Sequence, residues 1–454
     1  MTKTVDDKRS PGFSRRSVLK GAAVGVAGLA IPTTFGIRNA YAQSRKLRVV
    51  TSATFKLADA WKATSEPERD ASYMRATWEV LNAWREKHPD VEMQFEEVPW
   101  DQVTSTAILA AQSGTEADVI QINDLNIPKL ARGGFLLPLD DFSDQWDDYN
   151  QHLLRGIASF DGKIYAAPWM TDCRHEMYWK SDYDKVGIAE PASTWSEFTD
   201  QLVAIKESGV ANPYAFWAGN SVHTPTQSLL APLWMLGGDV LDAEGRAKLN
   251  TPEMEEVFGF YSMLMNDKQV ASRDLIALSD GGAFGDQIVS HKVAVSKNGA
   301  WIWQTVTAAG AADDIGYFRT PRPSADAPDA TLSGFWAYQL PARTGVDDAQ
   351  QELAAEFALH MTSSESQAVI LSQTDGQLPT RPSATQSAQA AEKDDAWRFQ
   401  ASYAAEAGRG MPPAADAGLL FDQMRTAFQR VLAGEASAAD ALTAAESAYN
   451  SQVG

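Results

Sequence analysis

The chain has 454 residues, of which 44% are hydrophobic, and its 39 Lys and Arg against 59 Asp and Glu give a formal net charge of −20 at pH 7. Such acidity repels nucleic acid and anionic lipid at long range, so neither is expected as a partner. The single cysteine, Cys173, excludes an internal disulfide, and without a C-x-x-C or a metal-ligand spacing we expect it to be inert.

Residues 1–42 have the order of parts that is typical of an export signal. Twin arginines lie in Ser14–Lys20, a short apolar run follows in Gly21–Pro32, and small residues form an A-x-A cleavage site at Ala40–Ala42. We therefore expect export by the twin-arginine machinery, with the signal removed after Ala42. No later stretch approaches the ~18 apolar residues of a membrane helix, which predicts a soluble product.

The position of the cysteine also bears on where the mature protein is kept. Cys173 lies far from the cleavage site, so it cannot carry a lipid at the mature N-terminus. An exported protein without an anchor must be retained by a second membrane. We therefore expect a Gram-negative periplasm.

Strand and helix patterns alternate through the first part of the mature chain. Apolar residues at 47–50, alternation over 91–98 and a continuous apolar run at 117–122 predict three strands, with helical spacing between Tyr73 and Trp84. This order predicts a mostly parallel sheet covered by helices on both faces. The mature chain of roughly 410 residues also exceeds the ~250 to 300 at which one core stops growing, so at least two domains are expected.

The stretch Asp161–Lys180 predicts a passage from one lobe to another. Asp161 and Gly162 form a hairpin turn, and Pro168 removes a ladder donor, so the strand is expected to end there. Polar groups beyond it, Asp172 and Arg174, lie where open α/β sheets place their ligand crevices. An ordinary hairpin followed by a surface loop is the alternative.

The pattern begins again after this passage. A capping box at Thr194–Glu197 opens a helix, further helices are predicted over 228–236 and 254–265, and a strand over 293–295 is followed by an Asn298-Gly299 turn. The proline-rich segment 321–328 predicts a second crossing. We therefore expect two discontinuous lobes, a first made of 43–166 and 322–376 and a second made of 167–321 and 377–454.

Seven pieces in a fixed order resemble the carbohydrate-binding members of the family 1 extracellular solute-binding proteins, the receptors of ATP-driven importers, with a layout similar to the maltodextrin-binding proteins. The pieces are ADVIQINDLNIPKLARGGFLLPLDDF at 117, DGKIYAAPW at 161, STWSEF at 193, KVAVSKNGAWIWQ at 292, TSSESQAVI at 362, GQLPTRPS at 376 and FQRVLAGEASAADALTAA at 428. The resemblance implies an α/β, two-lobe periplasmic binding protein-like (type II) fold with a hinge and an interlobe ligand cleft. It also implies an inner-membrane ABC permease as partner and a monomeric receptor. The 54–71 segment is longer than the family's usual link, which leaves the identity of the sugar open.

A neutral sugar calls for flat aromatic platforms and for charged or amide hydrogen-bond partners. Five tryptophans stand just beyond strands or turns, where they are either platforms or core: Trp169, Trp217, Trp301, Trp303 and Trp336. Trp301 matches the family's N-G-x-W position, whose ring commonly stacks on the sugar.

The resemblance and the sequence together give four polar candidates. Asp124 matches a position that often binds hydroxyls, although it could instead cap the helix that starts at Ile127. Asp172 and Arg174 could bind ligand or pair with each other. Arg381 matches the third crossing and could contact the sugar or lock the hinge.

Enzyme motifs are missing from the sequence. It contains no H-E-x-x-H, no G-x-S-x-G and no phosphate-binding glycine loop, and its six histidines are scattered singly. We therefore expect a binding protein with no catalytic residues, no metal and no cofactor. A receptor for a polyol or another small solute is the alternative, and a periplasmic glycoside hydrolase, which would also use paired carboxylates, is a further one.

Overall fold

The computed structural model describes residues 45–453, apart from 69–72, 100–101, 104, 107, 110–116, 279–280, 344 and 374–375. These residues belong to one compact unit, Ser44–Gly454. The expected export signal and its cleavage after Ala42 lie outside the described residues, as does the end of the 54–71 segment.

The first sheet has six strands in the order β13-β6-β12-β3-β1-β2. The strands are β1 (Arg45–Ser52), β2 (Val91–Val98), β3 (Val119–Asn123), β6 (Ala167–Thr171), β12 (Phe335–Gln339) and β13 (Leu378–Pro379). β1 pairs with β2 and β3 in parallel, as the alternating pattern predicted. β12 then runs antiparallel to both β3 and β6, and β13 antiparallel to β6, so the sheet is mixed.

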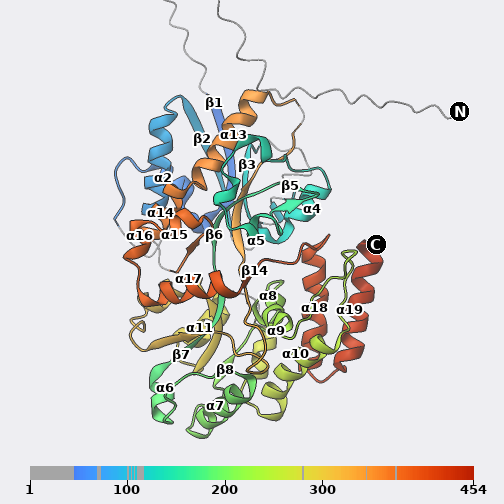
Figure 1. The fold of residues 1–454 in the computed structure, drawn as a ribbon. Helices are drawn as coiled ribbons and strands as arrows, with labels where there is room; N and C mark the ends of the chain where they lie inside the picture. Colours follow the sequence, from blue (N-terminus) through green and yellow to red (C-terminus); the bar gives the residue numbers. More distant parts are fainter. Residues whose placement is uncertain are drawn as a thin grey trace, which may run out of the picture. The chain divides into compact units, whose positions relative to one another are not determined.

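Helices of this first lobe carry the apolar stripes that cover the sheet. Trp84 in α2 is fully buried and packs edge-on against Phe357 of α13 at a ring separation of 5.2 Å. α14 packs against both α2 and the short α16 (Figure 1). The helices of this lobe are α1 (Leu57–Lys62), α2 (Met74–Lys87), α4 (Ile127–Arg132), α5 (Gln151–Leu154), α13 (Asp348–Met361), α14 (Ser364–Gln373), α15 (Pro382–Thr385) and α16 (Ala388–Ala391).

The second sheet has four strands in the order β10-β7-β9-β8. They are β7 (Arg174–Trp179), β8 (Tyr214–Ala215), β9 (Val295–Gly299) and β10 (Ile315–Phe318). β7 lies in the middle and runs antiparallel to β9 and β10, whereas β8 is parallel to β9. A buried ion pair, Lys297 to Glu176 at 3.1 Å, joins β9 to β7.

The helices of the second lobe include a C-terminal pair that packs on α10 (Figure 1). The capping box predicted for α7 is confirmed: Glu197 N–H donates to Thr194 Oγ1 at 3.4 Å, and Thr194 N–H donates to the Glu197 carboxylate at 3.1 Å. The helices are α6 (Lys180–Lys185), α7 (Trp195–Glu207), α8 (Thr224–Ser228), α9 (Leu230–Met235), α10 (Pro252–Ser262) with a π-turn at Met263–Asp267, α11 (Gly281–Val289), α12 (Trp303–Ala308), α18 (Ala417–Leu432) and α19 (Ala438–Val453). None of the helices in the described ranges is long and apolar enough to cross a membrane.

The first crossing between the sheets lies later than the sequence predicted. The expected hairpin forms between β4 (Ser159–Phe160) and β5 (Lys163–Ile164), with Asp161 and Gly162 at positive φ. Pro168, however, does not end a strand, because it lies in β6 opposite Ala337, where the register shifts and the missing N–H is tolerated. The chain therefore changes sheet at Asp172–Cys173, after Thr171 rather than after Ala166.

The other two crossings lie against the first. Between β10 and β12 the chain forms the short β11 (Thr331–Leu332), which pairs in parallel with β14 (Gly408–Arg409). The chain reaches β14 from the first sheet through α17 (Asp395–Ala407). Since β13 belongs to the first sheet, the third crossing follows Pro379 instead of beginning at residue 377.

Candidate functional site

Arg174 is the first residue of β7, directly after the first crossing, and its side chain is almost fully buried. Its Nε donates to Gln227 Oε1 at 3.1 Å, and its Nη1 donates to the Asp172 carboxylate. The backbone is fixed as well, because Arg174 N–H donates to Thr331 Oγ1 at 2.9 Å and the Thr331 hydroxyl donates to the Arg174 carbonyl at 2.7 Å. Arg174 thus links the first crossing, through Asp172, and the second crossing, through Thr331, to Gln227 of the second lobe.

Trp301 lies beside this guanidinium, with the Arg174 Cζ 5.3 Å from its ring centroid. The Asn298-Gly299 pair that was predicted as a turn belongs to β9 instead. Gly299 is needed there for space, because a Cβ at this position would lie 2.0 Å from a ring carbon of Trp301. The half-buried indole is therefore held between the end of β9 and a cation, an arrangement that favours the cation–π attraction.

Asp124 follows β3 and is buried, with only 3% of its surface exposed. Its Oδ2 accepts the Phe335 N–H at 3.1 Å, which links it to the start of β12. The capping alternative for Asp124 is wrong, since Asn123 caps the 3₁₀ turn here and Asn126, without a side-chain bond, precedes α4. Burial raises the pKa of Asp124 to about 7, against the opposing effects of the Arg174 charge and the Phe335 N–H.

Burial shifts the pKa values of the groups around Arg174 toward their neutral forms. Burial raises the pKa of Asp172, although the neighbouring Arg174 opposes this rise. Burial, with a smaller effect of Arg174, lowers the pKa of His223 to about 4, so this histidine is neutral at pH 7. Two carboxyl groups, Asp124 and Asp172, therefore face one permanent cation.

Two of the predicted tryptophans, Trp169 and Trp336, belong to an aromatic group around Phe55. Phe55 lies edge-on to Trp169 at 4.8 Å and to Trp336 at 5.0 Å. Trp169 is fully buried and also contacts Tyr338, which places it in the core of the first lobe. Trp336 is half-buried and stays a candidate platform, next in the chain to the residue that Asp124 binds.

The other two tryptophans pack inside the second lobe. Trp217 is stacked on Phe284 at 4.3 Å and only 4% exposed, and Trp303 lies edge-on to Tyr317 at 6.0 Å. Neither has a ring contact with Arg174 among the described residues. A position just beyond a strand suggested that these rings bind the sugar, but the same position also allows a ring to pack into the core of its lobe.

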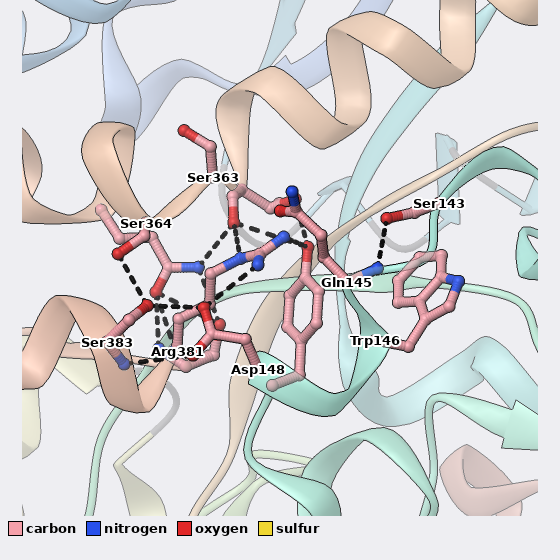
Figure 2. A network of polar contacts seen from close by, with 12 residues as sticks. Ser143, Gln145, Trp146, Asp148, Ser363, Ser364, Arg381 and Ser383 are labelled. Atoms are coloured by element: carbon pink, nitrogen blue, oxygen red, sulfur yellow. Dashed lines mark hydrogen bonds and ion pairs between the residues drawn. The ribbon is translucent and has the colours of Figure 1, made fainter.

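Arg381 belongs to a separate network, in the first lobe (Figure 2). Its Nε donates to the Thr362 carbonyl at 2.7 Å, its Nη2 to the Tyr149 hydroxyl at 2.8 Å, and its Nη1 pairs with Asp148 at 3.3 Å. Asp148 also accepts from Ser383 Oγ at 2.5 Å. The structure thus places Arg381 with the elements flanking β13 and not with Asp124 and Arg174.

Sequence reasoning missed three partners of the cluster: Gln227, Thr331 and Gly334. Gln227 lies in a helix of five residues without a motif or an apolar period, so no local signal marks it. Gly334 leaves room for the arginine, since a Cβ there would lie 3.2 Å from Arg174 Nη1. Each of the three residues meets Arg174 through a contact between segments far apart in the chain, which leaves no local signal in the sequence.

A surface hollow of about 410 Å³ lies elsewhere in the first lobe, between α2, α13 and α14. Trp84, His360 and Val369 are among its lining residues, and none of the predicted site residues is. Its position away from both sheets' crossings separates it from the cluster around Arg174.

Two curated relatives share part of this sequence. A binding protein of Brucella abortus is 28% identical over 193 residues, which are 42% of this chain and 46% of that protein, so the match spans less than half of the relative's length. The diacetylchitobiose binding protein DasA of Streptomyces coelicolor is 26% identical over 304 residues, which are 64% of this chain and 66% of DasA.

Solved structures share the fold over nearly the whole described chain. The GacH receptor of Streptomyces glaucescens, solved alone and with acarbose, has a TM-score of 0.74 at 21% identity and covers 90% of this chain and 98% of its own. UgpB of Mycobacterium tuberculosis, in complex with glycerophosphocholine, has a TM-score of 0.74 at 18% identity with the same coverage of both chains. These likenesses show a two-lobe, type II periplasmic binding protein fold.

The family match covers most of the chain. The family model of the bacterial extracellular solute-binding proteins matches residues 66–368, which include the cluster around Arg174, all four strands of the second sheet and every strand of the first sheet except β1 and β13. Together with the mixed α/β fold in two lobes, this match identifies the chain as a member of the bacterial extracellular solute-binding protein family.

Proposed function

We propose that this protein is the substrate-binding component of an ABC importer, which captures a neutral sugar, from monosaccharide to oligosaccharide, between two closing lobes and delivers it to an inner-membrane permease. The observation that carries the proposal is the meeting of Trp301, Arg174, Asp124 and Asp172 where the chain first changes sheet. Hinge closure around a small solute relies on a few such linking residues.

The chemistry of the cluster suits a sugar ring. The Trp301 indole offers an apolar face for the C–H side of a pyranose, and charged groups make stronger hydrogen bonds to hydroxyls than neutral ones. Asp124 lies on the first lobe, whereas Trp301 lies on the second. A solute that touched both would favour the closed arrangement.

The balance of charge favours a neutral ligand over an anionic one. With the pKa of Asp124 at about 7 and His223 neutral, Asp172 offsets Arg174 and the cluster has no surplus positive charge to attract a phosphodiester. DasA is named a diacetylchitobiose binding protein and the GacH receptor was solved with acarbose, which supports a sugar as the ligand. UgpB, in contrast, was solved with glycerophosphocholine. A polyol or another small neutral solute is the second candidate.

A thermal-shift panel tests the solute class directly. The mature protein is melted with monosaccharides, maltodextrins, chitooligosaccharides, polyols and glycerophosphocholine, each at millimolar concentration. A solute present at 100 times its dissociation constant adds about 2.7 kcal/mol to the free energy of unfolding, which raises the melting temperature by several degrees. A shift with glycerophosphocholine alone, or no shift with any sugar, would contradict the proposal.

The same samples separate a receptor from a hydrolase. The family consists of binding proteins, and we propose that this member has no enzymatic activity, metal or cofactor. Oligosaccharides that raise the melting temperature are incubated with the protein and analysed by chromatography. Stoichiometric binding without shorter products supports a receptor, and turnover into products would establish an enzyme instead.

Closure and export give two further checks. Solute should reduce the radius of gyration of a monomer in small-angle scattering, because the two lobes approach each other.

Changing Arg15 and Arg16 together to Lys should leave the precursor in the cytoplasm, because the twin-arginine pathway does not accept this replacement. Accumulation of the double variant in the periplasm would show that another export route is used.

A further inference from the structure

Gln227 is a buried residue of α8 that lies against Arg174, with its Oε1 accepting from Arg174 Nε at 3.1 Å. We propose that Gln227 is a positioning residue for solute capture, which holds the plane of the Arg174 guanidinium against Trp301. The inference rests on the proposed function, because the solute is the one that would stack on Trp301. It adds a residue of the second lobe whose role is to orient the site without touching the ligand.

The geometry gives Gln227 this role because the guanidinium is planar and is held at two of its nitrogens. Nη1 donates to Asp172 on the first crossing and, at 3.5 Å, to the Leu332 carbonyl on the second, whereas Nε donates to Gln227. Two bonded nitrogens fix the orientation of a rigid fork, and one alone does not. Without Gln227 the guanidinium would be held at Nη1 alone, by Asp172 and the Leu332 carbonyl.

The remaining donors are the ones that a solute could use. Within the part of the chain that the structure describes, the hydrogen bonds of the Arg174 side chain come from Nε and Nη1. Nη2 therefore keeps two N–H groups that a hydroxyl oxygen could accept, on a guanidinium whose Cζ lies 5.3 Å from the Trp301 ring centroid. Their direction depends on the plane that Gln227 fixes.

A neutral amide is well suited to this position. Arg174 already pairs with Asp172 and faces Asp124, so a third carboxylate would add negative charge to a buried cluster whose cation already has a partner. The amide oxygen of Gln227 accepts from Nε without adding any. A glutamate at 227 should still orient the guanidinium, which makes it a test of the acceptor itself.

The first experiment needs no solute. In nitrogen-15 spectra of the full mature protein, the Arg174 Nε–H should give a slowly exchanging signal, assigned by its loss in Arg174→Lys. We expect the slow exchange to persist in Gln227→Glu and to disappear in Gln227→Met, which fills the same space without an acceptor. Equal protection in Gln227→Met and the wild type would overturn the inference.

The second experiment measures affinity for the sugar that gives the largest thermal shift. Loss of a hydrogen bond to a charged group should weaken binding by about ten-fold to a hundred-fold in Gln227→Met, measured where the variant is still folded because the unpaired Nε–H also lowers its melting temperature, with most of the affinity recovered in Gln227→Glu. If Gln227 acts through Arg174, the double variant with Arg174→Met should bind no more weakly than Arg174→Met alone. Additive losses, or wild-type affinity in Gln227→Met, would contradict this role.

A matched control comes from the same lobe. Gln201 in α7 also uses its amide, donating to the Glu190 carbonyl at 2.9 Å and accepting from Ala192 N–H at 3.0 Å, away from Arg174. Gln201→Met should leave affinity unchanged, and a loss there as large as in Gln227→Met would argue for a general effect on the lobe. A wild type that binds nothing in the panel would count against the proposed function, whereas the Nε–H signal would still decide the role of Gln227.

Discussion

Two buried arginines, Arg174 and Arg381, have nearly the same exposure, 6% and 3%, and nearly the same kinds of partner. Each has a carboxylate and a carbonyl within reach, and each lies over an aromatic ring. They differ in where those partners come from. Arg381 ties elements of the first lobe to one another, whereas Arg174 ties the crossing segments to α8 and β9 of the second lobe.

The difference separates two uses of one residue type. A guanidinium whose Nε, Nη1 and Nη2 all have partners within one lobe can only hold that lobe together, as Arg381 does in Figure 2. A guanidinium placed where the chain changes sheet, whose described hydrogen bonds come from Nε and Nη1 and whose Cζ lies near an aromatic ring, can respond to a ligand. Burial alone therefore does not distinguish a binding arginine from a structural one.

The largest effect is expected for Arg381→Met. This change removes the cation from a buried network, unpairs Asp148 and takes one hydrogen bond each from the Tyr149 hydroxyl and the Thr362 carbonyl, which should cost about 3 to 5 kcal/mol of folding free energy. Denaturant unfolding measures the loss, and affinity for the solute should be retained. Arg398→Met, at an exposed arginine with a partner three residues away, is the control and should change little. Lost affinity at full stability would place Arg381 in the site after all.

Trp301→Ala tests whether the aromatic ring beside Arg174 binds the sugar or stabilises the fold. If the ring stacks on a sugar, affinity should fall by about 2 to 4 kcal/mol, or roughly 30-fold to 1,000-fold, with a small change in melting temperature because the ring is half-buried. Calorimetric titration measures the affinity. Trp217→Ala is the matched variant: its stacked, buried ring should instead cost about 3 to 5 kcal/mol of stability. A large drop in melting temperature with affinity retained would remove Trp301 from the site.

The third prediction concerns pH and Asp124. Because its pKa is raised from 3.8 to about 7 in the folded protein, the folded state binds an extra proton between these values. Stability from this group is therefore present at low pH and is lost as pH rises toward 7, by on the order of 2 kcal/mol between pH 5 and 8. Asp124→Asn removes this dependence.

Denaturant unfolding of the wild type and Asp124→Asn at both pH values tests this. The stability of the variant relative to the wild type should increase from pH 5 to pH 8. A constant difference would mean that the Asp124 carboxylate is ionised without penalty. Glu197→Gln is a suitable control: hydrogen bonds from Ser193 and Thr194 lower the pKa of Glu197 below its ordinary value, so it is ionised in both states above pH 5 and its effect should stay nearly constant from pH 5 to pH 8.

The smallest effect is expected at an exposed contact between the lobes. Lys129 of α4 pairs with Asp416, the N-cap of α18, at 2.7 Å, and 41% of the lysine side chain is exposed. Solvent screening limits such pairs to at most about 1 kcal/mol. Lys129→Gln should therefore change stability by a few tenths of a kcal/mol, with a difference that shrinks as salt is added. Asp416 is left intact because its other oxygen caps α18. A loss of several kcal/mol of folding free energy would show that this ion pair, and not Arg174, is the main contact that holds the two lobes together.

Local chemistry was enough to predict much of the fold. The apolar periods predicted the strands β1, β2 and β3 with their parallel pairing, the capping box predicted α7, and the Asp161-Gly162 turn predicted the hairpin of β4 and β5. Each of these signals depends on neighbours within a few residues. The same holds for Arg174 and Asp172, whose adjacency suggested either binding or pairing, and whose pairing the structure shows.

What the sequence could not predict depends on residues that are far apart in the chain. Pro168 was expected to end a strand, and only the register shift opposite Ala337 explains why it does not. Arg381 was grouped with the ligand residues because it follows a crossing, but Thr362, Tyr149 and Asp148 use its donors.

The tryptophans and Gln227 show the same division. Composition and position beyond strands marked five rings as candidates, and packing against Phe284, Tyr317 and Tyr338 placed three of them in the cores of the two lobes. Gln227 has no local mark at all, and its place beside Arg174 arises because α8 packs on β9. The sequence by itself therefore determined the elements and the family, since both follow from local patterns. Only the tertiary structure decided which polar and aromatic groups meet, because each meeting depends on contacts between distant segments.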